Sequence, residues 1–174
     1  MIFVSVGTTH PFDRLIRAVD EAVERRLVEE RVYAQIGSGA YEPRNFEYVR
    51  SMGKHAFDEC VRSASGIISH AGMGILTAAL DHDKPVLAMP RRKCYGEAVN
   101  DHQVAIAREF ARLGHVLVAW EPADLFREIV KLGGFVPAPR RGQAAAVVDR
   151  VRRFLDDTQL AMSLRFREAA RAEK

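Results

Sequence analysis

Residues 66–76 read GIISHAGMGIL and combine a strand pattern with a helix pattern. The apolar run at 66–68 is typical of a buried strand, and the residues from Ile75 to Asp81 have helical spacing. The glycines between them allow a tight turn and let the backbone approach a ligand closely. The first N–H groups of a helix are unpaired, and with the helix dipole they attract an anion such as a diphosphate. A βα turn that binds nothing explains this segment equally well.

Strand-like and helix-like segments alternate along the chain. The expected strands are Ile2–Val6, Val32–Ile36, Phe46–Val49, Gly66–Ser69, Val86–Met89 and Val116–Trp120. The expected helices are Phe12–Leu27, Phe57–Ala64, Gly74–Asp81, Asn100–Leu113, Pro122–Leu132 and Gln143–Asp156. Alternation of this kind predicts an α/β fold, a Rossmann-like and mostly parallel sheet of about six strands with helices on both faces. The expected domain covers residues 1–157, and a basic helical tail covers 158–174.

The composition is that of an ordinary globular protein of 174 residues, and no apolar run approaches the ~20 residues of a membrane span. The N-terminus reads as a first strand and not as a signal peptide, which favours a cytoplasmic protein with free thiols at Cys60 and Cys94. The net charge of +3 is uneven, because residues 138–174 contain nine basic and five acidic side chains. This segment could meet an anionic partner or membrane surface, or it could be a solvated helix face.

Ligands of such sheets bind beyond the carboxyl ends of the strands, where the sequence places four polar or glycine-rich clusters. They are Gly7–His10, Gly37–Gly39, His70–Gly74 and Arg91–Gln103. In the last cluster, arginines suit phosphate oxygens, and the carboxylates and amides suit sugar hydroxyls. Asn100 or Asp101 is also expected to cap the next helix, so a capped, solvated loop remains an alternative.

Other site chemistries lack their sequence signatures. His70, His102 and Glu97 do not have the spacing of HExxH or CxxC, so no metal is expected. Ser69-His70 does not lie in a GxSxG elbow, which argues against a hydrolase. Walker A is missing, and Gly37-Ser38-Gly39 is too short for a dinucleotide fingerprint. Nucleic acid is not an expected partner, because no aromatic residues interleave with the C-terminal arginines.

Taken together, several motifs resemble one glycosyltransferase family. They are Gly7-Thr8-Thr9 with Phe12-Asp13-Arg14-Leu15, His70-Ala71-Gly72-Met73-Gly74, Lys84-Pro85, Pro90-Arg91-Arg92, Gly96-Glu97 and Asn100-Asp101-His102-Gln103. Over about residues 1–155 the chain is similar to the family 28 C-terminal domain, the nucleotide-sugar-binding half of GT-B glycosyltransferases. It resembles the stand-alone subunits of split enzymes, namely the soluble subunit of dolichyl-diphosphate N-acetylglucosamine transferase and bacterial exopolysaccharide glycosyltransferase subunits.

The resemblance implies a UDP-sugar donor, UDP-N-acetylglucosamine among the candidates, and no further cofactor. It places Gly7, Thr8 and Thr9 near the phosphates, and gives His70, Gly72, Met73 and Gly74 backbone N–H groups that face the diphosphate. Gly37, Ser38 and the turn at 54–57 would flank the uridine. Arg91 is a candidate phosphate ligand on the chemistry of its guanidinium alone. Glu97, Asn100, Asp101 and Gln103 would hold the sugar and ribose. Ala78 stands where larger relatives carry a ribose-binding Glu, and Glu97 is the candidate to replace it.

The resemblance also implies a division of labour. A chain of this size has room for one Rossmann-like half, so the acceptor and the general base are expected on a membrane-associated partner. The expected reaction moves a hexose or N-acetylhexosamine from UDP to a lipid-linked acceptor, with this heteromeric subunit peripheral at the cytoplasmic face of the membrane through its partner. A non-catalytic nucleotide-binding or scaffold protein, and a self-sufficient homodimeric transferase with a soluble acceptor, remain alternatives.

Overall fold

Six parallel strands form one sheet in the computed structural model, which describes residues 1–139, 148–156 and 158. They are β1 (Ile2–Ser5), β2 (Val32–Gln35), β3 (Glu47–Val49), β4 (Gly66–His70), β5 (Val86–Met89) and β6 (Leu117–Val118). Across the sheet the order is β3-β2-β1-β4-β5-β6. Strands β2 and β3 are therefore added on one side of β1, and β4, β5 and β6 on the other, so the order of the strands reverses between β1 and β4. The predicted parallel, six-stranded sheet is confirmed, and the reversal marks the crevice where such folds bind ligands.

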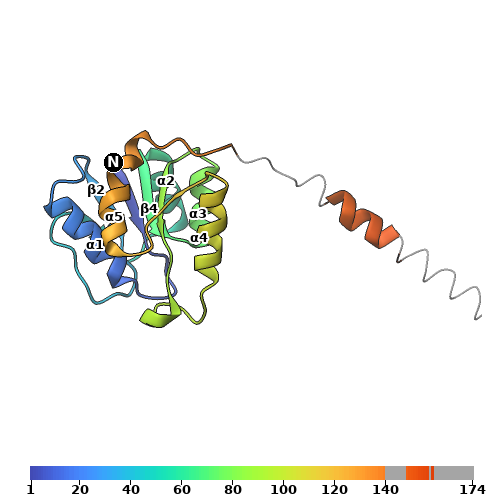
Figure 1. Ribbon diagram of the computed structural model, residues 1–174, viewed down its shortest axis with the longest axis horizontal. Helices are drawn as coiled ribbons and strands as arrows, with labels where there is room; N and C mark the ends of the chain where they lie inside the picture. Colours follow the sequence, from blue (N-terminus) through green and yellow to red (C-terminus); the bar gives the residue numbers. More distant parts are fainter. Residues whose placement is uncertain (140–147, 157, 159–174) are drawn as a thin grey trace, which may run out of the picture. The chain divides into compact units, whose positions relative to one another are not determined.

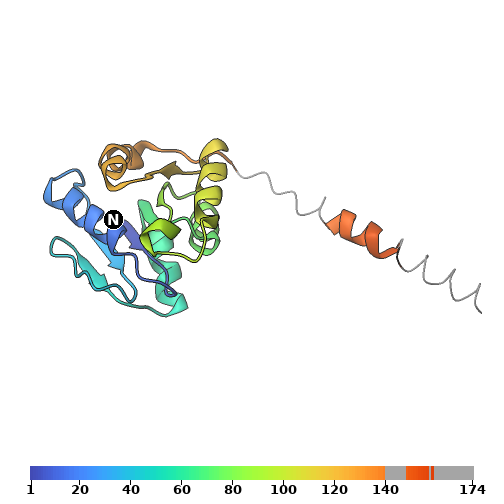
Figure 2. The same cartoon turned by 60° about the horizontal axis from the view of Figure 1, so that its bottom comes forward.

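Helices cover both faces of this sheet, as predicted (Figure 1; Figure 2). One face packs against α1 (Asp13–Glu24), α5 (Pro122–Glu128) and the 3-10 helix η2 (Ile129–Gly134). The other packs against α2 (Lys54–Ser63), α3 (Met73–Leu80) and α4 (His102–Arg112). A short 3-10 helix, η1 (Lys93–Tyr95), lies in the loop between β5 and α4.

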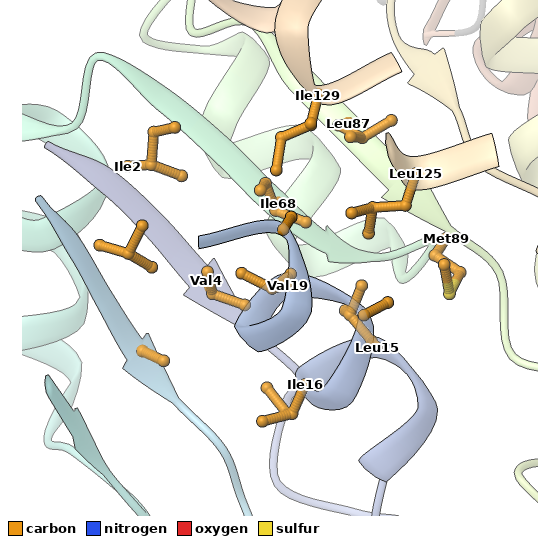
Figure 3. Packing of buried hydrophobic residues seen from close by; sticks show 14 of the residues in the cluster. Ile2, Val4, Leu15, Ile16, Val19, Ile68, Leu87, Met89, Leu125 and Ile129 are labelled. Atoms are coloured by element: carbon orange, nitrogen blue, oxygen red, sulfur yellow. The ribbon is translucent and has the colours of Figure 1, made fainter. Parts of the chain in front are cut away.

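The strands are apolar at consecutive positions because the side chains on the two faces of the sheet pack into two separate hydrophobic cores. Within β4, Ile68 packs toward α1 and α5, while its neighbour Ile67 packs toward α2, α3 and α4. Figure 3 shows the first core, in which Val4 and Ile68 meet Leu15 and Val19 of α1. All of these side chains are fully buried. This two-sided burial explains why the strands lack polar alternation.

Several predicted boundaries differ from the structure. Helix α1 ends at Glu24 instead of Leu27, because Arg26 adopts a left-handed φ of 57°. Helix α2 begins at Lys54, three residues before the predicted start at Phe57. Helix α4 begins at His102, two residues after the predicted start. The predicted helix over 122–132 divides into α5 and η2, and the last strand shortens to Leu117–Val118.

Gly114 and Ala138 lie at the amino edge of the sheet, meaning the edge at which the parallel strands begin. Gly114, with φ 72°, ends α4 there as the predicted C′ glycine. The Ala138 N–H donates to the Gly114 carbonyl at 2.9 Å, and the Ala138 carbonyl accepts from His115 Nδ1 at 2.9 Å. Met1 precedes β1 at this same edge, where its carbonyl accepts from the Ser65 N–H at 2.9 Å.

The chain divides into two units, Met1–Pro139 and Arg140–Lys174. The second is described only at 148–156 and 158, where it is helical, so the predicted helix is confirmed from 148 onward. Its start at Gln143, residue 157 beside the predicted domain boundary, and the tail at 159–174 lie outside the described residues. Exposed apolar side chains on the helix are Val148, Val151, Phe154 and Leu155. Within the described part of the chain, no helix combines the length and apolarity needed to cross a bilayer.

Candidate functional site

A cleft of about 450 Å³ opens at the carboxyl edge of the sheet, around the ends of β1, β2 and β4. Its lining residues are Ser5, Gly7, Thr8, Thr9, Gln35, Met52, Lys54, Phe57, Asp58, His70, Gly74, Ile75 and Ala78. The structure thus brings together five predicted residues of the two glycine-containing loops, Gly7, Thr8, Thr9, His70 and Gly74, and it adds Lys54 and Phe57 from the predicted turn at 54–57. A hollow of about 430 Å³ at the amino edge, near Leu27 and Val130, contains none of them.

The glycine-rich turn delivers α3 to this cleft. Gly72 is the N-cap, and its carbonyl accepts the first helical hydrogen bond from the Leu76 N–H at 3.1 Å. The N–H groups of Met73, Gly74 and Ile75 therefore lie in the unpaired first turn. The Gly72 N–H, which was also expected to face a diphosphate, donates to the His70 carbonyl at 2.9 Å.

The His70 ring lies between two glycines that have no room for a side chain. A Cβ atom at Gly72 would be 2.3 Å from His70 Nε2, and one at Gly7 would be 3.0 Å from His70 Cε1. Gly7 also has a φ of 73°, which disfavours other residues. The imidazole between them therefore requires glycine at both Gly7 and Gly72, and at Gly7 the backbone conformation requires it as well.

His70 is a neutral imidazole at physiological pH. Its pKa is lowered to about 4, mainly by burial and also by the positive charge of Arg91, while a contact with the Ser5 carbonyl acts in the opposite direction. His70 Nδ1 lies 3.4 Å from the Ser5 carbonyl oxygen. Because a carbonyl oxygen only accepts, the single proton of the neutral ring belongs on Nδ1 and Nε2 is an acceptor.

The floor of the cleft is a buried polar pair that the sequence analysis missed. Ser5 Oγ donates to Gln35 Oε1 at 2.8 Å, and both side chains are buried. Their signal in the sequence is a polar residue at the end of an otherwise apolar strand. Apolar side chains of Met52, Phe57 and Ala78 also line the cleft, and α2 adds the ion pair of Lys54 with Asp58.

The remaining predicted residues do not line the cleft; they are Gly37, Ser38, Gly72, Met73, Arg91, Glu97, Asn100, Asp101 and Gln103. Arg91 is only 4% exposed, and its Nη2 donates to the carbonyls of Val6, at 2.6 Å, and His10. Gln103 Oε1 accepts from the Arg91 N–H at 3.1 Å. The arginine predicted to meet phosphate thus supports the loop that does line the cleft.

Glu97 and its neighbours are likewise engaged within the protein. Both Glu97 oxygens accept from Arg14, at 2.8 Å each, so the carboxylate expected to replace the ribose-binding Glu is paired with this guanidinium. Asp101 is the N-cap residue of α4, one of the two residues expected there, but its Oδ1 accepts from the Lys93 N–H at 2.8 Å and makes no capping hydrogen bond to the helix. Asn100 Oδ1 accepts from the His102 N–H at 3.2 Å.

Gly37, in the loop after β2, has a φ of 66° and packs against the Gly7 carbonyl.

Known proteins share this architecture. An NMR solution structure of ALG13 aligns with a TM-score of 0.55 and 18% identity, covering 86% of this chain and 93% of that one. The glycotransferase of kitacinnamycin aligns with a TM-score of 0.56 and 23% identity over 76% of this chain and 34% of that one. These likenesses show a fold found in glycosyltransferases.

Sequence comparison assigns the family. "UDP-N-acetylglucosamine transferase subunit ALG13" of Homo sapiens is 31% identical over 126 residues, which is 66% of this chain and 10% of that protein. The Mus musculus protein of that name is 30% identical over 125 residues, again 66% and 10%. The chain thus spans about a tenth of the length of these relatives. The profile of the glycosyltransferase family 28 C-terminal domain matches residues 1–146, and the chain belongs to that family.

Proposed function

We propose that this chain binds a UDP-sugar in the cleft and is the donor half of a split glycosyltransferase. The observation that supports this most directly is the meeting of the unpaired N–H groups of α3 with an apolar wall in one cleft. The N–H groups and the helix dipole suit a diphosphate. The wall formed by Met52 and Phe57 suits the flat face of a uracil base.

The proposed donor is UDP-N-acetylglucosamine or a related UDP-hexose. The curated relatives are named as UDP-N-acetylglucosamine transferase subunits, which supports both the donor and the need for a second subunit. Thr8 and Thr9 place two hydroxyl groups beside the α3 N-terminus, where they can donate to phosphate oxygens. The sugar would then extend toward the loop between β5 and α4.

In the transfer step, an acceptor hydroxyl oxygen forms a bond to the anomeric carbon of the sugar. The bond from that carbon to the β-phosphate oxygen breaks, and UDP leaves with the electron pair. The α3 N–H groups stabilise the charge that develops on the leaving diphosphate. The acceptor proton passes to a general base on the partner subunit, which also binds the lipid-linked acceptor.

The proposed partner is a membrane-associated subunit, which would bring this chain to the cytoplasmic face of the membrane. The helix at 148–156 offers a surface for such contact, because Val148, Val151 and Leu155 are exposed at helical spacing. Arginines at 150, 152 and 153 give the same helix a basic character. Both features support a docking role for the second unit.

The test is a calorimetric titration of the full chain with UDP, using ADP and GDP as competitors for selectivity. Gly74→Asp is the informative variant, because a Cβ there meets nothing within 4 Å and an acidic residue suits the first turn of a helix. Its carboxylate should repel the diphosphate and weaken UDP binding tenfold or more. Gly133→Asp, at a glycine with equal space at the other edge of the sheet, is the matched control.

Selective UDP binding that Gly74→Asp weakens and Gly133→Asp preserves would support the donor site. A wild-type chain that binds no UDP, alone or co-purified with its membrane subunit, would overturn the proposal. UDP binding without transfer in the presence of that subunit would favour a nucleotide-binding scaffold. Full-rate transfer by the chain alone would favour a self-sufficient homodimer.

A further inference from the structure

Arg14, in the first turn of α1, does not line the cleft, but at the carboxyl edge of the sheet it connects α1 with two other segments of the chain. Its Nε and Nη2 donate to the two Glu97 oxygens, each at 2.8 Å. Nη2 also donates to the Pro90 carbonyl at 3.0 Å, and Nη1 donates to the Trp120 carbonyl at 3.4 Å. The guanidinium therefore connects α1 to the loop before α4 and to the residues before α5.

The ion pair is enclosed and fully engaged with protein groups. The Arg14 and Glu97 side chains are 15% and 10% exposed. The Tyr95 ring centroid lies 4.7 Å from the guanidinium carbon, and Glu97 Oε2 accepts a further hydrogen bond from the Arg92 N–H at 3.0 Å. Because its donors bind protein groups, this guanidinium stabilises the conformation of a loop and does not bind a ligand directly.

The loop that Arg14 holds, residues 90–99, is also joined to the cleft. Arg91 in this loop donates to the carbonyls of Val6 and His10, which flank the cleft residues Gly7, Thr8 and Thr9. Loop 90–99 runs directly into Asn100 and Asp101 at the start of α4. Displacement of this loop around Glu97 would shift Asn100 and Asp101, toward which the proposed sugar extends, whereas the bonds of Arg91 to Val6 and His10 hold the loop at 7–9 in place.

We infer that Arg14 is a positioning residue for the donor sugar, acting through Glu97 on loop 90–99. This inference rests on the proposed function, because it assumes that a UDP-sugar occupies the cleft. A planar guanidinium matches the two carboxylate oxygens in a way that no other side chain does, so the position favours Arg over Lys. The expected signature is a loss of affinity for the sugar part of the donor while the UDP part still binds.

The experiment compares UDP with UDP-N-acetylglucosamine and UDP-glucose by calorimetry, on the wild-type chain and on Arg14→Gln. Glu97→Gln is the second variant, which keeps the shape of the side chain and removes only its charge. Arg31→Gln is the control, because it removes the same charge from an exposed pair with Glu47. Each variant is also melted, and the double variant Arg14→Gln/Glu97→Gln measures whether the two residues act together.

We expect every variant to bind UDP with an affinity within twofold of wild type. Arg14→Gln and Glu97→Gln should each bind tenfold more weakly the UDP-sugar that the wild type binds more tightly. The double variant should lose no more than either single variant. Equal losses for UDP and UDP-sugar that follow the melting temperature would indicate a purely structural role and overturn the inference. So would a wild-type chain that binds UDP and both UDP-sugars equally. A wild-type chain that binds none of them refutes the proposed function itself.

Discussion

The strongest quantitative prediction concerns Gly72 and the imidazole beside it. Replacing Gly72 with Ala places a Cβ 2.3 Å from His70 Nε2 and 2.8 Å from Cδ2, far inside van der Waals contact. The backbone does not resist the change, because Gly72 has an ordinary φ of −87°. The ring cannot simply retreat, since the Gly7 backbone lies on its other side. Overpacking of this kind costs about 2 kcal/mol of unfolding free energy.

The prediction is best tested by a double-mutant cycle with His70→Ala, which removes the ring. Gly72→Ala should cost about 2 kcal/mol in the wild type but about 0.5 kcal/mol or less in the His70→Ala background. Urea denaturation followed by circular dichroism measures both values. Gly74→Ala is the matched control two residues on, and it should be neutral or slightly stabilising because its Cβ meets nothing within 4 Å. If Gly72→Ala were as mild as Gly74→Ala, or showed no coupling to His70, the reasoning about this ring would be refuted.

Three further predictions concern His70, Gly39 and Asp20. His70 has a pKa of about 4 in the folded protein and about 6.5 in the unfolded chain, so its contribution to the free energy of unfolding is present above pH 6.5. About 3 kcal/mol of this contribution is lost as the pH falls toward 4. His70→Gln should make the free energy of unfolding in urea less dependent on pH over this range, and an unchanged slope would contradict the prediction. Gly39→Ala should destabilise the fold by about 2 kcal/mol, because its Cβ would lie 2.0 Å from Asp13 Oδ1, whereas Gly53→Ala, with open space, should not. Asp20→Ala should cost about 3 kcal/mol by thermal melting, since the buried carboxylate accepts from the Tyr41 hydroxyl at 2.6 Å and the Asn45 N–H at 2.9 Å. Glu21→Ala, at a neighbouring side chain that is 45% exposed, should cost under about 0.5 kcal/mol, and equal costs would argue against this assignment.

The architecture was predictable because the signals for it are local. Each strand is a short apolar run, each run is followed by a helical pattern, and the order of these segments implies a parallel sheet. Gly7, Thr8, Thr9, His70 and Gly74 could be placed at the carboxyl edge because they follow strands directly. The structure confirms that they meet in one cleft.

The partners of the charged loop could not be predicted, because they depend on contacts between distant segments. Glu97 lies 83 residues from Arg14, and Arg91 lies 85 residues from Val6, so no periodicity connects them. From sequence alone, acidic and basic residues in a loop at this edge suggest ligand contacts. In the folded chain several of them instead satisfy one another and the backbone. Lys54 and Phe57 belong to the turn that the family resemblance pointed to, whereas Asp58 became visible as a site residue only once α2 was seen to begin at Lys54.

The positions of Met1 and Ala138 have a practical consequence for binding measurements. Both lie at the amino edge of the sheet, where Met1 bonds to Ser65 and Ala138 bonds to Gly114. The cleft opens at the opposite edge. A fluorophore or a surface-immobilisation tag attached at residue 1 would therefore start on the far side of the sheet from the ligand. Such labels would report nucleotide binding without competing for the entrance.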